Sequence, residues 1–226
     1  MSDFHGKVVV ITGAAGALGS ATAAHFAAAG ARLALLDLAA LDGPHYSRVC
    51  DLIDPTACRE AVASIEADVG PVDVLANIVG GFTMGEAVHE TTDQTWDFMM
   101  SLNARTVLNM ARAVVPGMLE RGRGRIVNIA AGAGQHGVAR LGAYSASKSV
   151  VIRLTEAMSG ELKEQGINVN CILPSVIDTP ANRQSMPDAD FGKWVRPEAM
   201  ARVIGFLCSE AAEPIHGTAL PVSGLS

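Results

Sequence analysis

A tyrosine and a lysine stand four positions apart at the start of a predicted helix. They belong to the segment Tyr144-Ser145-Ala146-Ser147-Lys148, which follows a Gly-rich loop. The i, i+4 spacing places the phenol and the ammonium on one face of the helix, one turn apart. A free phenol titrates near pH ~10, and a nearby ammonium lowers that pKa, which makes the phenol a better proton donor and acceptor for a carbonyl or an alcohol. The pair predicts general acid–base chemistry, although an ordinary helix pair has the same spacing.

A glycine-rich turn follows the first predicted strand and precedes a predicted helix. Its residues are Thr12-Gly13-Ala14-Ala15-Gly16-Ala17-Leu18-Gly19. Glycines at such a turn let the backbone approach a pyrophosphate, and the N-terminus of the helix faces the negative charge. A turn of this kind can also serve packing alone, but its position between a strand and a helix, with an acidic residue downstream, favours a dinucleotide site. We therefore expect Gly13, Gly16, Leu18 and Gly19 to contact the cofactor.

The acidic residue is Asp37, which ends the second predicted strand 18 positions after Gly19. There its carboxylate can accept hydrogen bonds from both ribose hydroxyls of the adenosine half, and it would repel a 2′-phosphate. Leu38 follows it, and no Lys or Arg in the glycine turn could neutralise the extra charge of NADP. The sequence therefore predicts NAD as the cofactor, rather than NADP.

The elements that position these residues alternate along the chain. Short β-branched runs predict strands, and Gly-terminated segments with apolar residues at helical spacing predict helices. This alternation requires right-handed crossovers and predicts a Rossmann-like, doubly wound α/β fold with a parallel sheet and its ligand beyond the carboxyl ends of the strands. We expect residues 1–226 to form a single dinucleotide-binding domain. Strands are expected at 8–11, 33–36, 72–76, 125–129 and 168–173, and helices at 18–29, 55–69, 95–121, 142–165 and 197–209.

Composition narrows the classes of partner. Hydrophobic residues make up 49% and charged residues 18% of the chain, as expected for buried parallel strands. The net charge of −6 and the lack of a long Lys/Arg cluster argue against nucleic-acid binding. No uncharged stretch is long enough to span a membrane, and the N-terminal apolar run is too short for a signal peptide. Cys50, Cys58, Cys171 and Cys208 fit neither a metal motif nor a disulfide framework, so we expect reduced core thiols, no metal and a cytoplasmic protein.

Taken together, these features resemble the short-chain dehydrogenase/reductase family of the classical type, over essentially the whole chain. The resemblance implies hydride transfer between NAD(H) and a small substrate. It implies that Tyr144 donates or accepts the proton, that Lys148 also binds the nicotinamide ribose, and that Asn103 holds a proton-relay water. The further cofactor contacts that it implies are Asp51 and Leu52 at the adenine, Asn77 and Gly80 at the middle of the cofactor, and Pro174, Ile177 and Thr179 near the nicotinamide.

One departure from the family pattern concerns the chemistry. The family's catalytic serine lies 13 residues before the tyrosine, and Ala131 stands at that position. A serine hydroxyl there stabilises a developing alkoxide, and losing one such donor typically lowers the rate by about 10²–10³. The carboxyl-terminal third is similar to dihydropteridine reductase, a family member that lacks this serine and reduces an electron-poor quinonoid pterin. A quinonoid dihydropterin or a similar activated heterocycle is therefore one expected substrate.

Two other functions stay open from the sequence: an alcohol/ketone oxidoreductase working without the serine, and a non-catalytic protein that senses NADH. Retention of Tyr144, Lys148 and Asn103 argues against the second. The segment 182–194 sits where the family places its substrate lid, so Met186, Phe191 and Trp194 are expected to border the substrate, unless the aromatic pair clamps the lid shut. The long Ala-rich helices resemble those through which the family forms homodimers or homotetramers.

Overall fold

The computed structural model describes residues 4–225, and its strands form one parallel sheet. The spatial order is β3-β2-β1-β4-β5-β6-β7. The chain first builds outward from β1 through β2 to β3 and then crosses to β4, so the strand order reverses between β1 and β4, where open α/β sheets bind their ligands. The prediction of a Rossmann-like, doubly wound fold is confirmed. The strands are β1 (Val8–Thr12), β2 (Arg32–Asp37), β3 (Tyr46–Val49), β4 (Val72–Asn77), β5 (Gly124–Ile129), β6 (Ile167–Pro174) and β7 (Ala219–Val222).

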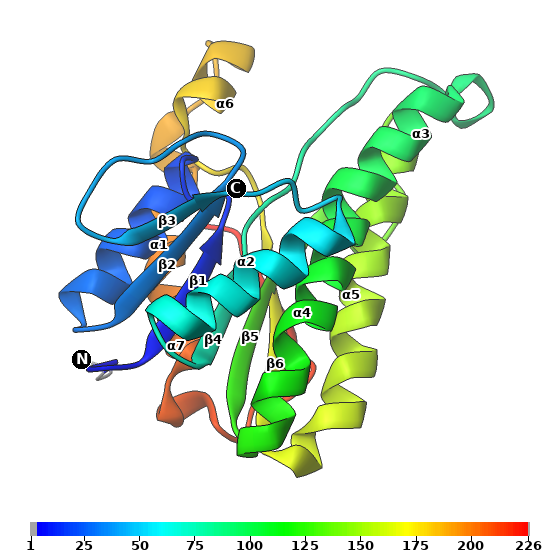
Figure 1. Ribbon diagram of the computed structural model, residues 1–226. Coiled ribbons are helices and arrows are strands. Elements are labelled where there is room, and N and C mark those ends of the chain that lie inside the picture. Colours follow the sequence, from blue (N-terminus) through cyan, green and yellow to red (C-terminus); the bar gives the residue numbers. More distant parts are fainter. Residues whose placement is uncertain (1–3, 226) are drawn as a thin grey trace.

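Helices cover both faces of the sheet. In Figure 1, α2, α4 and α5 lie on the face toward the viewer, and α1 and α7 pack on the opposite face. Side chains alternate along β1 accordingly: Val8 and Val10 join the core under α2, whereas Val9 and Ile11 join the core under α1. The helices are α1 (Ala17–Ala28), α2 (Pro55–Asp68), α3 (Asp93–Met99), α4 (Thr106–Arg121), α5 (Gly142–Leu162), α6 (Pro180–Ser185) and α7 (Pro197–Cys208).

The expected single helix over 95–121 is wrong in one respect. The segment begins at Asp93, after the N-cap Thr92, and it is interrupted by π-helical turns over Met100–Arg105 before α4 starts. An apolar pattern read at helical spacing does not reveal such an insertion. π-helical turns are frequent at functional sites, and this one contains Asn103. No helix in the part of the chain that the structure describes is long and apolar enough to cross a membrane.

Candidate active site

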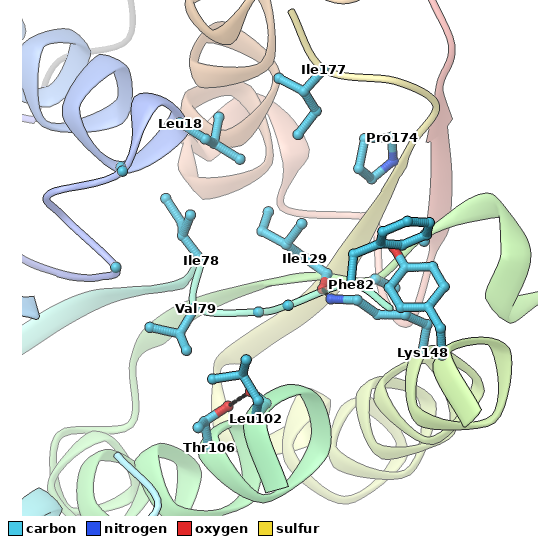
Figure 2. A pocket seen from close by; sticks show the side chains of 18 of the residues that line it. Leu18, Ile78, Val79, Phe82, Leu102, Thr106, Ile129, Lys148, Pro174 and Ile177 are labelled. Atoms are coloured by element: carbon cyan, nitrogen blue, oxygen red, sulfur yellow. Dashed lines mark hydrogen bonds between the residues drawn. The ribbon is translucent and has the colours of Figure 1, made fainter. Parts of the chain in front are cut away.

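A pocket of about 910 Å³ opens at the carboxyl ends of the strands. The glycine turn, the segments after β2, β4, β5 and β6, and the start of α5 contribute to its lining. In Figure 2, Leu18 and Ile78 lie on one side of the pocket, and Phe82 and Lys148 lie on the other. Its volume is in the range of small-molecule and cofactor sites, and it lies at the switch point of the sheet.

The glycine turn has the geometry of an anion cradle. Gly13 has a φ of +66°, and a Cβ added to Gly19 would lie 2.1 Å from the carbonyl oxygen of Gly13. Only glycine fits at either position. Gly16 is the N-cap of α1 without a side-chain hydrogen bond, so the first backbone N–H groups of the helix are available to a negatively charged group. The turn therefore fits a pyrophosphate.

Asp37 stands beside this turn at the end of β2. Its carboxylate accepts a hydrogen bond from the backbone N–H of Ala15 at 2.9 Å and one from Ala39 at 3.0 Å. The adjacent Leu38 is 69% exposed and also lines the pocket. Asp51 and Leu52 line the pocket as well. The residues expected to contact the adenosine half of the cofactor thus belong to one cavity.

Tyr144 and Lys148 line the same pocket. Lys148 is 4% exposed, and its Nζ donates a hydrogen bond to the carbonyl oxygen of Ile129 at 2.9 Å. Burial lowers the pKa of Lys148 to about 8 and raises the pKa of Tyr144 to about 12. The expectation that the ammonium lowers the tyrosine pKa is wrong for this structure, because desolvation of the phenol dominates. At neutral pH Tyr144 is a protonated phenol, and its raised pKa makes it a weaker acid than a free phenol.

The sequence interpretation missed Phe82, which packs directly against Tyr144. The two ring centroids are 4.9 Å apart, with an interplanar angle of 78°. Phe82 follows Gly81, where an added Cβ would lie 2.4 Å from Cδ2 of Leu102, so a side chain at position 81 would displace the side chain of Leu102. An aromatic residue directly after Gly80-Gly81 was the available signal. The pocket lining also has an apolar part, which includes Ala131, Ala133, Leu141 and Met186.

Asn103 does not line the pocket but holds the Phe82 loop against the helix of Tyr144. Its Oδ1 accepts a hydrogen bond from the backbone N–H of Gly81 at 2.9 Å. Its Nδ2 donates to the carbonyl oxygen of Gly81 at 3.1 Å and to Oγ of Ser147 at 3.0 Å. Both amide hydrogens are used in these contacts, so the side-chain amide has no donor left for a relay water.

The remaining predicted cofactor residues divide into two groups. Gly80, Pro174 and Ile177 line the pocket. Asn77 and Thr179 do not. The Asn77 amide donates to Oδ1 of buried Asn128 at 2.8 Å, and Oγ1 of Thr179 accepts the backbone N–H of Asn182 at the start of α6. In this geometry Asn77 links β4 to β5 by a side-chain hydrogen bond, and Thr179 is the N-cap of α6.

Of the three predicted substrate contacts, only Met186 lines the pocket. The rings of Phe191 and Trp194 lie 4.8 Å apart, and the guanidinium of Arg183 stands 4.8 Å from the centre of the Phe191 ring. Arg183 also donates two hydrogen bonds to Asp178, at 2.6 and 2.8 Å. The aromatic pair therefore takes the clamp arrangement, which ties the segment carrying α6 together.

Replacing Lys148 with Met is expected to stabilise the protein. The folded-state pKa of about 8 lies below the reference value of 10.5, so the unfolded chain binds this proton more tightly and wild-type stability falls as pH decreases from about 10.5 to 8. At pH ~7 the variant should gain about 1–3 kcal/mol in free energy of unfolding and lose this pH dependence. Urea denaturation of both proteins at several pH values measures the free energy of unfolding and its pH dependence. Lys163→Met, at an exposed position, is the control. A less stable Lys148→Met would contradict the account.

Comparison with known proteins identifies a family. A family model described as short chain dehydrogenase matches residues 7–190. The chain is 34% identical to dehydrogenase/reductase SDR family member 6 of Danio rerio, covering 99% of this chain and 98% of that protein. It is 32% identical to D-threitol dehydrogenase of Mycolicibacterium smegmatis, covering 97% and 92%. The crystal structure of levodione reductase has a TM-score of 0.90 at 28% identity, covering 98% and 97%. These names differ in substrate, and none supports the resemblance to dihydropteridine reductase.

Proposed function

The chain belongs to the short-chain dehydrogenase family of oxidoreductases, and we propose that it reduces a planar, electron-poor substrate such as a quinonoid dihydropterin, with NADH as cofactor. The observation that carries the proposal is the pairing of Tyr144 with Ala131 in the pocket. A phenol is available to give a proton, while a methyl group stands at the position of the family's serine. Such a site suits a substrate that accepts hydride without forming an alkoxide.

The fit of NAD rests on three features of the pocket. The glycine turn leaves room and free N–H groups for a pyrophosphate, Asp37 offers a carboxylate to the adenosine ribose, and the pocket continues to Tyr144. When bound, the nicotinamide supplies the hydride. Because Asp37 is anionic and Leu38 brings no charge, a 2′-phosphate would meet repulsion without compensation. This supports NAD over NADP.

The chain's own residues have separable roles in the proposed reaction. Tyr144 donates a proton from its phenol to the reduced substrate, and its raised pKa keeps that proton in place at neutral pH. Lys148, whose Nζ is fixed by the carbonyl oxygen of Ile129, would hold the nicotinamide ribose. Asn103 positions both Gly81 and the helix of Tyr144. Phe82 forms an aromatic wall against which a flat substrate can stack.

Replacing Asp37 with Ala tests the cofactor assignment. The loss of a charged acceptor should weaken NADH binding by about 10–100-fold, as expected for hydrogen bonds to a charged group. NADPH binding should change less or improve, because the repulsion of its 2′-phosphate disappears. Fluorescence titration of the wild type and the variant with each dinucleotide gives the four dissociation constants. Asp42→Ala, at an exposed position outside the pocket lining, is the control. Equal losses for NADH and NADPH would contradict a role at the ribose.

An alcohol/ketone oxidoreductase is the second candidate, favoured by the names of the relatives. D-threitol carries several hydroxyl groups, and a buried polyol needs matching hydrogen-bond partners. The apolar wall of Ala131, Ala133, Leu141 and Met186 offers none from its side chains. An apolar ketone would suit this wall better than a polyol.

A substrate panel separates these candidates. Loss of NADH absorbance is followed with quinonoid dihydropterin and with small aldehydes and ketones. The proposal predicts that kcat/KM for the pterin exceeds that for every carbonyl compound by at least about tenfold, a difference of about 1.4 kcal/mol in transition-state stabilisation. Turnover of carbonyl compounds alone would support the second candidate. Tight NADH binding without turnover of any compound would support the NADH-sensing alternative.

We further propose that the protein is a cytoplasmic homodimer or homotetramer. Trp96 and Phe98 of α3 are large apolar side chains that are more than two-fifths exposed, which supports a contact between copies at α3. The four cysteines are free thiols, in keeping with a reducing compartment.

A further inference from the structure

Two of the four cysteines come together beneath the adenosine end of the pocket. Cys50 directly follows β3, and Cys58 lies in the first turns of α2. Both are free, buried and part of the same core cluster. The turn between them is closed by the backbone N–H of Asp54, which donates to the carbonyl oxygen of Asp51 at 3.2 Å. Sγ of Cys58 lies 3.6 Å from the carbonyl oxygen of Leu52, two residues after Cys50, and the two thiols interact with one another.

The pair is held in place by neighbouring contacts. Sγ of Cys58 donates to the carbonyl oxygen of Leu52 at 3.6 Å. Asn109 of α4 donates to the same oxygen at 2.9 Å and to that of Ile53 at 3.0 Å. If the Cys58 sulfur turned away from Leu52, this oxygen would keep the Asn109 donor. A rotation of Cys58 toward Cys50 therefore leaves no buried carbonyl without a partner.

The two thiols differ in access and reactivity. Cys50 lines the pocket, next to Asp51 and Leu52, whereas Cys58 is fully buried behind it. Cys171 and Cys208 are absent from the described pocket lining. The interaction with Cys58 lowers the pKa of Cys50, and the same interaction, together with burial, raises the pKa of Cys58. Because Cys50 lines the pocket and Cys58 does not, a reagent that enters the pocket reaches Cys50 first, and Cys58 is placed to react second.

We propose that Cys50 and Cys58 are a peroxide-sensitive pair that closes into a reversible intramolecular disulfide. The Cys50 thiolate attacks one oxygen of a hydroperoxide, the O–O bond breaks, and the leaving oxygen takes a proton to become water or an alcohol. This gives a sulfenic acid on Cys50. The Cys58 sulfur then attacks the Cys50 sulfur, the S–O bond breaks, and water leaves with the Cys58 proton. Two thiols lose two electrons, and one peroxide gains them.

Disulfide formation has a consequence for the pocket. Asp51 and Leu52 lie inside the loop that the disulfide closes, and both line the adenosine end. Drawing Cys58 toward Cys50 shifts this loop, so the oxidised protein should bind NADH more weakly. Conversely, a bound dinucleotide should cover Cys50 and protect it from peroxide. These two consequences rest on the proposed cofactor, whereas the disulfide itself does not.

Peptide mapping of the whole protein under non-reducing conditions tests the disulfide. The reduced wild type is treated with hydrogen peroxide, and the remaining thiols are then alkylated. We expect a mass loss of about 2 Da before alkylation, for two hydrogens, and a linked peptide pair containing Cys50 and Cys58. Cys58→Ala should stop at a sulfenic acid that dimedone traps on Cys50, and Cys171→Ser should still form the disulfide. Persistence of both thiols, or a linkage between other cysteines or between chains, would overturn the proposal.

Titration with NADH then tests the consequence. The oxidised protein should bind NADH at least about tenfold more weakly, a change of about 1.4 kcal/mol, and a dithiol reductant should restore the affinity. NADH present during peroxide treatment should slow formation of the disulfide. An intact Cys50–Cys58 disulfide with unchanged NADH affinity would overturn the coupling to the pocket. Failure of NADH to bind even the reduced protein would instead count against the proposed cofactor.

Discussion

Tyr144→Phe is expected to lower kcat for NADH-dependent reduction by about 10²–10⁴-fold, the usual contribution of a positioned general acid. The phenol lines the pocket and is the proposed proton donor, whereas Nζ of Lys148, one turn further along α5, donates to the carbonyl oxygen of Ile129. The substitution keeps the ring and its edge contact with Phe82. The dissociation constant for NADH should therefore stay within about twofold of the wild-type value, which corresponds to less than about 0.5 kcal/mol.

Steady-state kinetics and a NADH titration on the same preparation measure both quantities. Tyr46→Phe in β3 is the matched control, because it removes a phenol hydroxyl from a half-buried residue outside the pocket lining. A Tyr144→Phe variant with wild-type kcat would contradict the role of Tyr144 as proton donor, since the proton would then come from another group. Loss of NADH binding would mean that the substitution disturbs the cofactor site.

Ala131→Ser is expected to act selectively on carbonyl substrates. Ala131 lines the pocket and follows β5 in an extended conformation, with φ −163° and ψ 157°. A hydroxyl here could stabilise a developing alkoxide, so kcat/KM for ketones should rise by about 10²–10³-fold. A quinonoid substrate forms no alkoxide and should gain less than about twofold by the same reasoning. The ratio of the two kcat/KM values, in wild type and variant, isolates the effect.

Ala133→Ser provides the comparison for this variant, because it adds the same hydroxyl at another position of the same pocket wall. It should leave the ratio near its wild-type value. A serine at position 131 that raises both activities equally would show that the quinonoid substrate also needs an oxyanion donor. The absence of the serine would then lower activity in general and would not indicate a quinonoid substrate.

Periodicity predicted the central elements of the fold well. The predicted strand at 168–173 differs by one residue at each end from β6. All residues of β6 are buried, including Asn168 and Asn170, whose side-chain amides donate to the carbonyl oxygen of Ile215. The edge strand β7 was not predicted, since it is four residues long, half-buried and contains Pro221. The six-residue helix α6 was also not predicted, because it is too short to show a helical period. Strand β3 was not predicted either, since its four residues are only half-buried or exposed.

The site was predictable where chain order alone determines it. A glycine turn between strand and helix, an acidic residue at the end of the next strand, and a Tyr144/Lys148 pair reach one pocket because parallel strands end at one edge of the sheet. Contacts between distant segments were not predictable, as for Phe82 on Tyr144. The pKa of Tyr144 depends on how deeply the phenol is buried, which spacing along a helix does not report. The clamp of Phe191 likewise depends on Arg183 reaching it.

The most direct test of hydride transfer from NADH to the substrate is to follow the transferred hydrogen itself. Wild-type protein is incubated with NADH deuterated at the transferable position of the nicotinamide, together with quinonoid dihydropterin, and the product is analysed by mass spectrometry. We expect deuterium to appear in the reduced pterin, and Tyr144→Phe to slow its appearance in proportion to kcat. Deuterium that stays on the dinucleotide while NADH binds tightly would contradict the account and identify a protein that binds the cofactor without using it.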